Sequence, residues 1–195
     1  MSPVTHLLAS WLIATKTTND VKDCRLVTLA GVAPDADGLG LIVDVTRTLF
    51  GMKSTMLYGR YHHFYWHGLF GAVVTSLIFA IFARQRFRVA LLCLVSFHLH
   101  ILCDFLGSRG PSPDDLWPIF YFGPFSKDPM WIWKGQWPLD GWINRLFSVS
   151  LLFGMMHLAV QKGNSVVEVF GRRANSVFVS VLQGWHQKLL PVKTK

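Results

Sequence analysis

The longest apolar runs in the chain have the length of membrane-spanning helices. His67 to Ala83 and Val89 to Leu106 contain almost no charged side chains, and a basic segment at 84–88 separates them. A third run, from Trp142 to Val160, is interrupted near its start by a polar pair and later by one histidine. Because a helix needs about 20 mostly apolar residues to cross a bilayer, these runs predict about three long spans, the first two near the lower limit of length.

Shorter apolar segments precede the first span. Val4 to Thr15 and Leu26 to Ala33 are too short to cross a bilayer alone, so they predict two short helices packed against the longer ones. Residues 107–141 are rich in Pro, Gly and Trp, which predicts a structured loop, because disordered segments are poor in aromatic residues. The pattern therefore predicts an all-α, multi-pass helical membrane protein. Residues 1–160 form one membrane-embedded domain, and residues 161–195 form a basic, partly amphipathic tail.

Composition supports a membrane environment. Hydrophobic residues make up 51% of the 195 residues and charged residues only 15%, against roughly 25% charged residues in an ordinary soluble domain. The formal net charge is +8, but the basic residues are scattered rather than gathered into one stripe, so we expect no nucleic-acid partner. We assign the excess positive charge to orientation in the membrane.

The distribution of charge orients the predicted helices. Most basic residues fall in the turn after the first short helix, in the segment at 84–88 and in the tail, and one topology puts all three on the same side. The opposite side then receives most of the acidic residues, namely Asp35, Asp37, Asp44, Asp104, Asp114, Asp115, Asp128 and Asp140. The positive-inside rule makes the basic side cytoplasmic. We therefore expect a bacterial inner membrane protein whose acidic side faces the periplasm.

Histidines and aspartates stand at those ends of apolar segments that this topology places on the acidic side. His100 and Asp104 are four residues apart in a helical run, so their side chains share one face, and ionisable groups in a span usually face an interior site. Asp35 and Asp37 follow a short apolar helix and can both turn towards one cation. Three histidines within six residues open the first span. The predicted metal-ligating set is His6, Asp35, Asp37, His62, His67, His100 and Asp104.

Three of these motifs also have an ordinary structural interpretation. The segment Asp35-Ala36-Asp37-Gly38 is typical of a solvated turn. The histidines at 62–67 could lie at the membrane interface beside aromatic residues. His6 is a single histidine on a short apolar helix, where a buried packing histidine is common.

The donor set favours one kind of chemistry. Imidazole and carboxylate ligands together favour Zn first and Mn second over Mg or Ca. A divalent ion of this kind activates water, so we interpret the set as the site of a metal-dependent hydrolase, with a free carboxylate of Asp35, Asp37 or Asp104 as general base. Because the site would lie at a membrane face, we expect membrane lipid around it and a lipid or lipid-linked phosphoester as substrate. Arg60 and Arg109 are candidates to bind an anionic substrate group or, equally, lipid headgroups.

The ordered set of motifs resembles a known family. Its elements are His6, Pro34-Asp35-Ala36-Asp37, Arg60-Tyr61-His62 with His67 five residues on, His100-Ile101-Leu102-Cys103-Asp104 and Leu116-Trp117-Pro118. In this order, over residues 2 to about 126, they resemble the YdjM-type family of inner-membrane metal-dependent hydrolases. The resemblance implies a helical membrane protein with a metal-dependent hydrolase site. A more distant likeness to the zinc phospholipase C and P1 nuclease folds implies phosphoester chemistry.

One segment departs from the family pattern. The family usually has His-Arg-Gly-x-Thr-His-Ser where residues 62–68 of this chain read His-His-Phe-Tyr-Trp-His-Gly. His63 therefore replaces an arginine that could bind an anion, whereas His62 and His67 are retained. Two other classes of function stay open: a non-enzymatic membrane protein that binds or transports a divalent metal, and a structural membrane protein with a decayed site.

Overall fold

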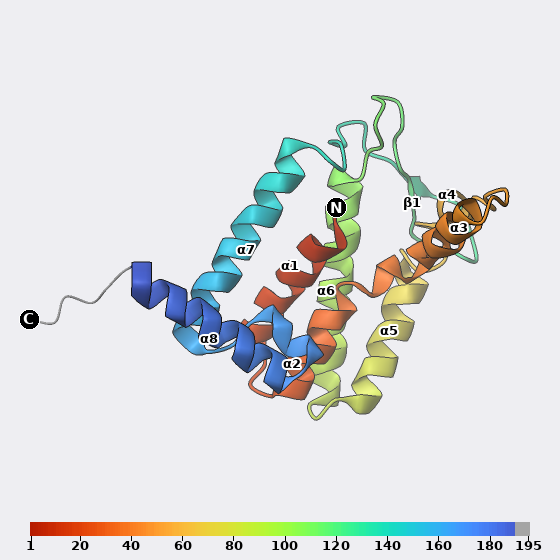
Figure 1. Ribbon diagram of the computed structural model, residues 1–195. Coiled ribbons are helices and arrows are strands. Elements are labelled where there is room, and N and C mark those ends of the chain that lie inside the picture. Colours follow the sequence, from red (N-terminus) through yellow and green to blue (C-terminus); the bar gives the residue numbers. More distant parts are fainter. Residues whose placement is uncertain (190–195) are drawn as a thin grey trace, which may run out of the picture.

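The computed structural model describes residues 1–189, apart from the side chain of Arg60, and is mostly helical (Figure 1). The elements follow in the order α1 (Pro3–Thr17), α2 (Val21–Ala30), η1 (Ala33–Leu39), α3 (Gly40–Leu49), α4 (Leu57–Tyr61), α5 (Leu69–Phe82), α6 (Arg86–Gly107), β1 (Ile119–Phe120), β2 (Met130–Trp131), α7 (Trp142–Lys162), η2 (Val166–Phe170) and α8 (Arg172–Leu189). The two short strands pair antiparallel within the loop between α6 and α7. The predicted all-α class is confirmed.

Two helices, α6 with 22 residues and α7 with 21, are long and apolar enough to cross a membrane. A third span results if α2 and the following segment, η1 with α3, are counted as one span. These two segments are bent by 51° relative to each other at a short break. The predicted span at 67–83 is a shorter helix, because α5 covers only Leu69–Phe82. Gly68 has an extended backbone, and the N–H of Leu69 donates to the carbonyl of Tyr121 at 2.8 Å. His67 therefore lies in the connection that precedes α5.

Both short N-terminal helices are present, although α2 begins five residues earlier and ends three residues earlier than predicted, and each begins at a capping residue. The side chain of Ser2 accepts a hydrogen bond from the N–H of Thr5, with Pro3 at the first helical position. The side chain of Asp20 accepts from two N–H groups in the first turn of α2. The sequence patterns did not predict η1, α3 and α4, which continue the chain after α2.

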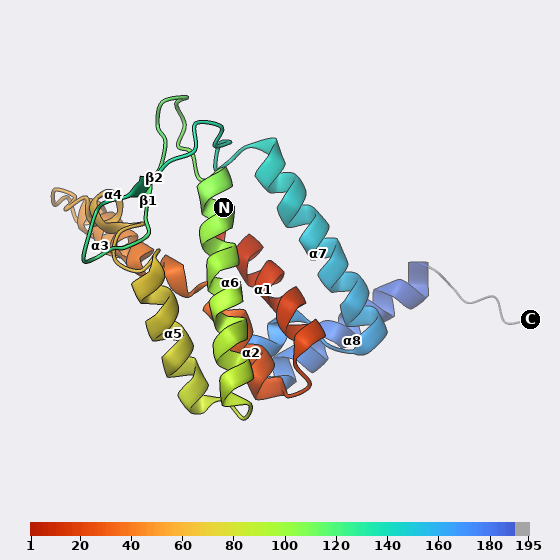
Figure 2. The same cartoon turned by 180° about the vertical axis from the view of Figure 1, so that it is seen from behind.

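The basic turns lie together at one end of the helix bundle (Figure 2). Asp23, at the start of α2, is buried and accepts hydrogen bonds from the N–H groups of Arg84 and Gln85 in the turn between α5 and α6, at 2.8 and 3.0 Å. Arg25 pairs with Glu168 of η2 at 2.7 Å. This is the arrangement that the charge pattern predicts, and it leaves the C-terminal end of α6 at the opposite end of the bundle.

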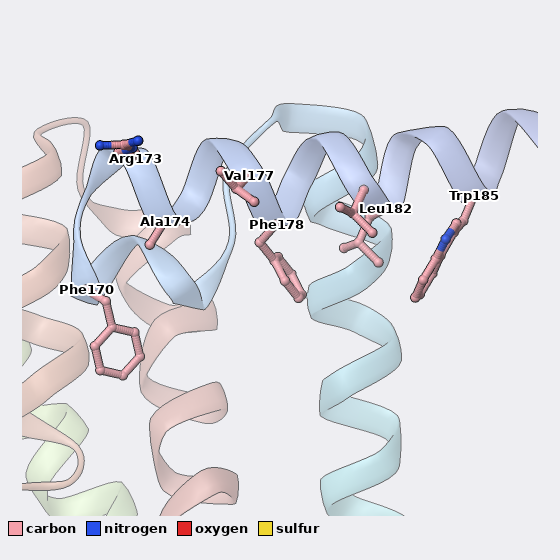
Figure 3. Close-up of a pocket in the computed structure, with 8 residues that line it drawn as sticks. Phe170, Arg173, Ala174, Val177, Phe178, Leu182 and Trp185 are labelled. Atoms are coloured by element: carbon pink, nitrogen blue, oxygen red, sulfur yellow. The ribbon is translucent and has the colours of Figure 1, made fainter.

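The larger hydrophobic core lies between α1, α2, α6, α7 and the C-terminal segment. Its buried members include Trp11, Val27, Cys93 and Ala159. The segment after residue 160 contributes to this core, because Val166, Val179 and Leu182 are buried in it. Other side chains of this segment line an apolar groove of about 740 Å³, among them Phe170, Val177 and Trp185 (Figure 3).

The loop between α6 and α7 is held by a buried asparagine. The side-chain amide of Asn144, in the first turn of α7, donates to the carbonyl of Gly107 at the end of α6. Its oxygen accepts from the indole of Trp137, whose backbone N–H donates to the carbonyl of Leu106. These bonds fix the loop over the C-terminal end of α6, which confirms the prediction of a structured loop.

Candidate metal centre

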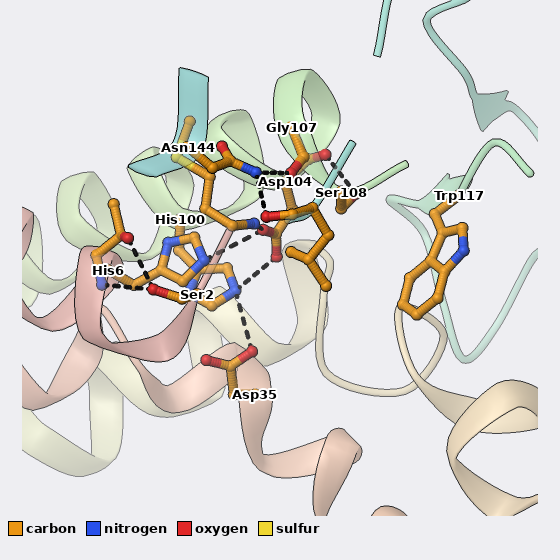
Figure 4. A network of polar contacts seen from close by, with 12 residues as sticks. Ser2, His6, Asp35, His100, Asp104, Gly107, Ser108, Trp117 and Asn144 are labelled. Atoms are coloured by element: carbon orange, nitrogen blue, oxygen red, sulfur yellow. Dashed lines mark hydrogen bonds and ion pairs between the residues drawn. The ribbon is translucent and has the colours of Figure 1, made fainter. Parts of the chain in front are cut away.

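Four side chains from three separate segments meet at the C-terminal end of α6. Asp35 comes from η1, His67 from the connection before α5, and His100 and Asp104 from α6. Each offers one ligand atom, and these four atoms all lie within 4.8 Å of one another. Asp35 stands opposite His100 and Asp104 in Figure 4. Asp104 is 18 residues from Arg86, the first residue of α6, so the cluster lies roughly 27 Å from the basic end of the bundle.

The separations between these atoms fit one small tetrahedral ion. The Nε2 atoms of His67 and His100 are 3.2 Å apart, and Asp104 Oδ2 lies 3.5 and 2.9 Å from them, respectively. Asp35 Oδ1 is 3.6 Å from His100 Nε2. Bonds of about 2.0–2.2 Å to a tetrahedral ion separate two ligand atoms by roughly 3.3–3.6 Å. The side chains therefore need only small movements to share one ion of the size of zinc.

Hydrogen bonds on the far side of each ring direct both Nε2 atoms into the cluster. His100 Nδ1 donates to the carbonyl of Gly31 at 2.7 Å, and His67 Nδ1 donates to the carboxylate of Asp37 at 3.0 Å. A carbonyl or carboxylate oxygen only accepts, so both Nδ1 atoms carry the proton of a neutral imidazole. Two Nε2 lone pairs then face each other beside two carboxylate oxygens. Either a metal ion or an additional proton on one of these nitrogens must lie between them.

Asp37 lies behind the cluster and orients its histidines. Its Oδ2 accepts from His67 Nδ1 and from the N–H of Trp66, and its Oδ1 lies 2.9 Å from His62 Nδ1. Both carboxylate oxygens of Asp37 therefore bind histidine rings, on the side of those rings that faces away from His100. A carboxylate bound to the free ring nitrogen of a ligand fixes its tautomer and increases its basicity. The structure thus places Asp37 outside the group of four and in contact with one of its members.

His6 adjoins the cluster from α1. Its ring stacks on that of His100 with centroids 3.6 Å apart, and its Nε2 lies 3.1 Å from Asp104 Oδ1. This contact lacks hydrogen-bond geometry, so both ring nitrogens of the buried His6 have no hydrogen-bond partner. The amino group of Met1 also contacts Asp104 Oδ1. Asp104 is thus the residue on which His6, His67, His100 and the amino group converge.

His62 belongs to a second group, which includes a histidine that the motif interpretation left out. His62, His63 and His67 can also bring one ligand atom each within 4.8 Å of one another. His63 is buried, and its Nε2 lies 3.7 Å from Asp104 Oδ2. Its backbone has a positive φ of 69°, which is uncommon outside glycine. The only available signal was the density of histidine in residues 62–67, because α-helical spacing separates adjacent residues by about 100°.

The comparisons with known proteins agree with the motif pattern. A family model described as YdjM inner membrane protein matches residues 1–184. The chain belongs to this family. The match extends beyond the motifs, which end near residue 126, to include all of α7 and most of α8. Neither the comparison with curated proteins nor that with solved structures found a match.

The chain is thus an inner membrane protein of the YdjM family. The cluster of Asp35, His67, His100 and Asp104 attracts positive charge. Burial by itself lowers the pKa of His67, but the carboxylates of Asp104 and Asp37 outweigh burial and raise this pKa to about 9. Burial, together with the charge of Asp35, raises the pKa of Tyr58 to about 12, so the phenol of Tyr58 keeps its proton. Without a metal ion, the cluster holds a proton on His67 at neutral pH.

The structure describes the side chain of one of the two arginines predicted to bind an anionic group in this YdjM-family chain, that of Arg109. The backbone of Arg109 pairs with the segment at 137–139, through the carbonyl of Trp137 and the N–H of Leu139. Arg109 does not line either of the cavities described below that border the cluster. The side chain of Arg60 lies outside the part of the chain that the structure describes. Its predicted role, like that of Arg109, stays a prediction.

Proposed function

We propose that this chain is a membrane-bound, metal-dependent hydrolase that cleaves a phosphoester in a lipid or lipid-linked substrate. One observation carries the proposal. The Nε2 atoms of His67 and His100 face each other at 3.2 Å, next to oxygens of Asp35 and Asp104, while each Nδ1 is bound to an acceptor. This geometry supports binding of a cation by two imidazoles and two carboxylates.

The charge of the cluster favours a divalent ion. Asp35, Asp37 and Asp104 contribute three formal negative charges against one amino group at Met1, which leaves an excess of two negative charges when the histidines are neutral. Mixed nitrogen and oxygen donors favour Zn first and Mn second. His67, His100, Asp104 and Asp35 would hold the ion. It would supply Lewis acidity, which polarises the scissile group and makes water nucleophilic near neutral pH.

Asp35 is the carboxylate best placed to act as general base. Both oxygens of Asp37 are bound to histidine rings, and both oxygens of Asp104 face histidines or the amino group of Met1. Asp35 would hold the ion through Oδ1, whereas its Oδ2 is buried, has no hydrogen-bond partner and stays free to accept a proton. In the proposed reaction, a water oxygen attacks phosphorus and its proton passes to Asp35. The bond between phosphorus and the leaving oxygen breaks, and that oxygen takes up the proton from Asp35, which restores the carboxylate.

We further propose that the site faces the periplasm and that the chain is multi-pass. The cluster lies at the opposite end of α6 from the basic turns joined by Asp23 and Glu168. Under the positive-inside rule the basic turns are cytoplasmic. Substrate would then reach the site from the outer leaflet of the inner membrane.

Metal analysis and a hydrolysis assay on the same purified protein test the proposal. We expect about one Zn or Mn per chain in the wild type, and metal-dependent hydrolysis of a lipid phosphoester. Asp104→Asn should lose both. Asp23→Asn serves as the control, because Asp23 is an equally buried aspartate at the other end of the bundle. Metal without hydrolysis would favour the metal-binding or transport alternative, and a chain without metal would favour a decayed site.

A further inference from the structure

Two cavities border the metal centre and share one wall. The first has a volume of about 440 Å³ and is lined in part by Asp35 and Asp104. The second has a volume of about 340 Å³. Four aromatic side chains line both cavities, namely Tyr58, His62, His63 and Trp117. Both volumes fall within the roughly 300–1,000 Å³ of small-molecule sites, so each can hold part of one ligand.

The remaining walls of the first cavity are mostly apolar, with Ser2 and Ser108 as the polar exceptions. We call it the apolar chamber; besides the shared wall and the metal centre, it is lined mainly by Pro3, Leu39, Leu41, Ile42 and Leu139. Leu39 precedes α3, and Leu41 and Ile42 lie in its first turn, with exposed fractions of 60%, 48% and 63%. A chamber that combines carboxylates at one end with exposed aliphatic side chains at the other suits a ligand that is polar at one end only.

The second cavity lies under the loop between α6 and β1. We call it the loop chamber; besides the shared wall, it is lined by Gly59, Asp115, Leu116, Pro118 and Phe120. Asp115 is the only ionisable side chain among these lining residues, and it carries negative charge. The loop chamber is therefore suited to a small uncharged or cationic group and unsuited to a second anionic one.

Trp117, the centre of the Leu116-Trp117-Pro118 motif, is fixed in place between the chambers. The side chain of the buried Gln136 accepts from the N–H of Trp117 at 3.0 Å and donates to its carbonyl at 2.8 Å. The indole N–H donates to Asp115, and the ring meets those of His62 and His63 edge-on, with centroids 5.7 and 5.4 Å apart. Figure 4 shows this indole across the site from Asp35 and Asp104. The buried side-chain amide of Gln136 uses both its oxygen and its NH2 group to bind the backbone of Trp117, which fixes the position of Trp117.

We infer that the substrate is an amphiphilic phosphodiester that occupies both chambers. Its aliphatic chain lies in the apolar chamber against Leu39, Leu41 and Ile42, and its small head group lies in the loop chamber. The phosphate lies between them, beside Asp35 and Asp104. Trp117 is a positioning residue that holds the head group against the shared wall. This inference rests on the proposed function and names the class of substrate.

The chamber assignment predicts a strong dependence on the aliphatic chain. Dioleoyl phosphatidylcholine in detergent micelles is compared with p-nitrophenylphosphorylcholine, which has the same head group and no aliphatic chain. We expect the wild-type kcat/KM to be at least about 100-fold higher for the lipid. We also expect dioleoyl phosphatidic acid, which lacks the head group and carries additional negative charge, to be a poor substrate because of Asp115.

A bulky side chain on α3 should selectively impair the lipid. Ile42→Trp narrows the apolar chamber, and the ratio of kcat/KM for the lipid to that for the chainless ester should fall at least about tenfold. Leu49→Trp is the matched control, because Leu49 lies on the same helix, is 80% exposed and does not line the chamber. An unchanged ratio in Ile42→Trp, or a wild-type preference for the chainless ester, would overturn the inference and leave the hydrolase proposal intact.

Binding of a non-hydrolysable ligand separates this inference from the proposed function. A phosphonate analogue of dioleoyl phosphatidylcholine is titrated into the same detergent-purified proteins, with metal content measured on each sample as a check of folding. We expect Ile42→Trp to weaken binding at least about tenfold and Leu49→Trp to leave it unchanged. If no phosphoester is hydrolysed, the proposed function fails; weakened binding in Ile42→Trp would still support the chambers, and equal binding would overturn them.

Discussion

Removing the charge of Asp37 tests whether this residue orients a metal ligand or is itself one. Asp37 Oδ2 accepts from His67 Nδ1 at 3.0 Å and from the N–H of Trp66 at 3.2 Å, while Oδ1 lies 2.9 Å from His62 Nδ1. In Asp37→Asn the amide oxygen can keep the first two bonds, and the amide nitrogen can donate to His62 in its other tautomer. The geometry of His67 then survives, and only the negative charge behind its ring is lost. Asp37→Ala loses both charge and geometry.

The expected magnitudes follow from this difference. Losing the carboxylate behind a ligating histidine costs about 10- to 100-fold in metal affinity, or about 1.4–2.7 kcal/mol. We place Asp37→Asn near the lower value and Asp37→Ala near the upper one. Asp104→Asn, which removes a ligand, should abolish stoichiometric binding. The assay is competition for zinc between the detergent-purified protein and a chromophoric chelator of known affinity.

Two comparisons make this experiment decisive. Asp23→Asn removes a buried carboxylate that accepts two backbone N–H bonds far from the cluster, so its zinc affinity should equal that of the wild type. If Asp37→Ala also binds zinc like the wild type, the argument that Asp37 directs His67 is refuted. If Asp37→Asn loses zinc as completely as Asp104→Asn, then Asp37 is a direct ligand and the group of four is wrong.

Three further predictions follow from the same contacts. Because the pKa of His67 is raised to about 9 in the metal-free site, zinc must displace its proton below that pH; zinc affinity measured by competition should therefore rise about tenfold per pH unit between pH 7 and 9 and level off above it. A Cβ at Gly31 would collide with Ser10 Oγ, so Gly31→Ala should destabilise the fold by about 1–3 kcal/mol, seen as a lower thermal midpoint. Gln136→Leu leaves the backbone N–H and carbonyl of Trp117 without their partner, which should cost about 1–3 kcal/mol and raise KM for the lipid more than it lowers kcat.

Much of the fold could be predicted from local pattern. The apolar runs predicted α6 and α7, because the length of an apolar helix that crosses a bilayer is set by the bilayer itself. The first predicted span was too long, because the extended backbone of Gly68 places the start of α5 at Leu69, whose free N–H binds the carbonyl of Tyr121. The amphipathic helix α3 was missed, since five of its ten residues are β-branched and have low helix propensity.

The candidate site, like the fold, could be predicted from the sequence only in part. The spacing of His100 and Asp104 follows from helical geometry alone, and the two residues meet at 2.9 Å. The distinct roles of Asp35 and Asp37 do not follow from their spacing, because they depend on which groups from other segments approach each oxygen. His63 likewise has a left-handed backbone conformation, which adjacent residues in a sequence do not reveal.

By itself, the sequence determined that the longest apolar segments are helical, which of their ends carry histidine and aspartate, and which ends carry the basic residues. These properties depend on periodicity, length and charge, all of which are local. Only the tertiary structure decided that Asp35 and His67 reach His100, because these residues lie 65 and 33 positions away along the chain. The path of the intervening chain, and hydrogen bonds such as that from His100 to the carbonyl of Gly31, determine whether such distant side chains point at one common atom.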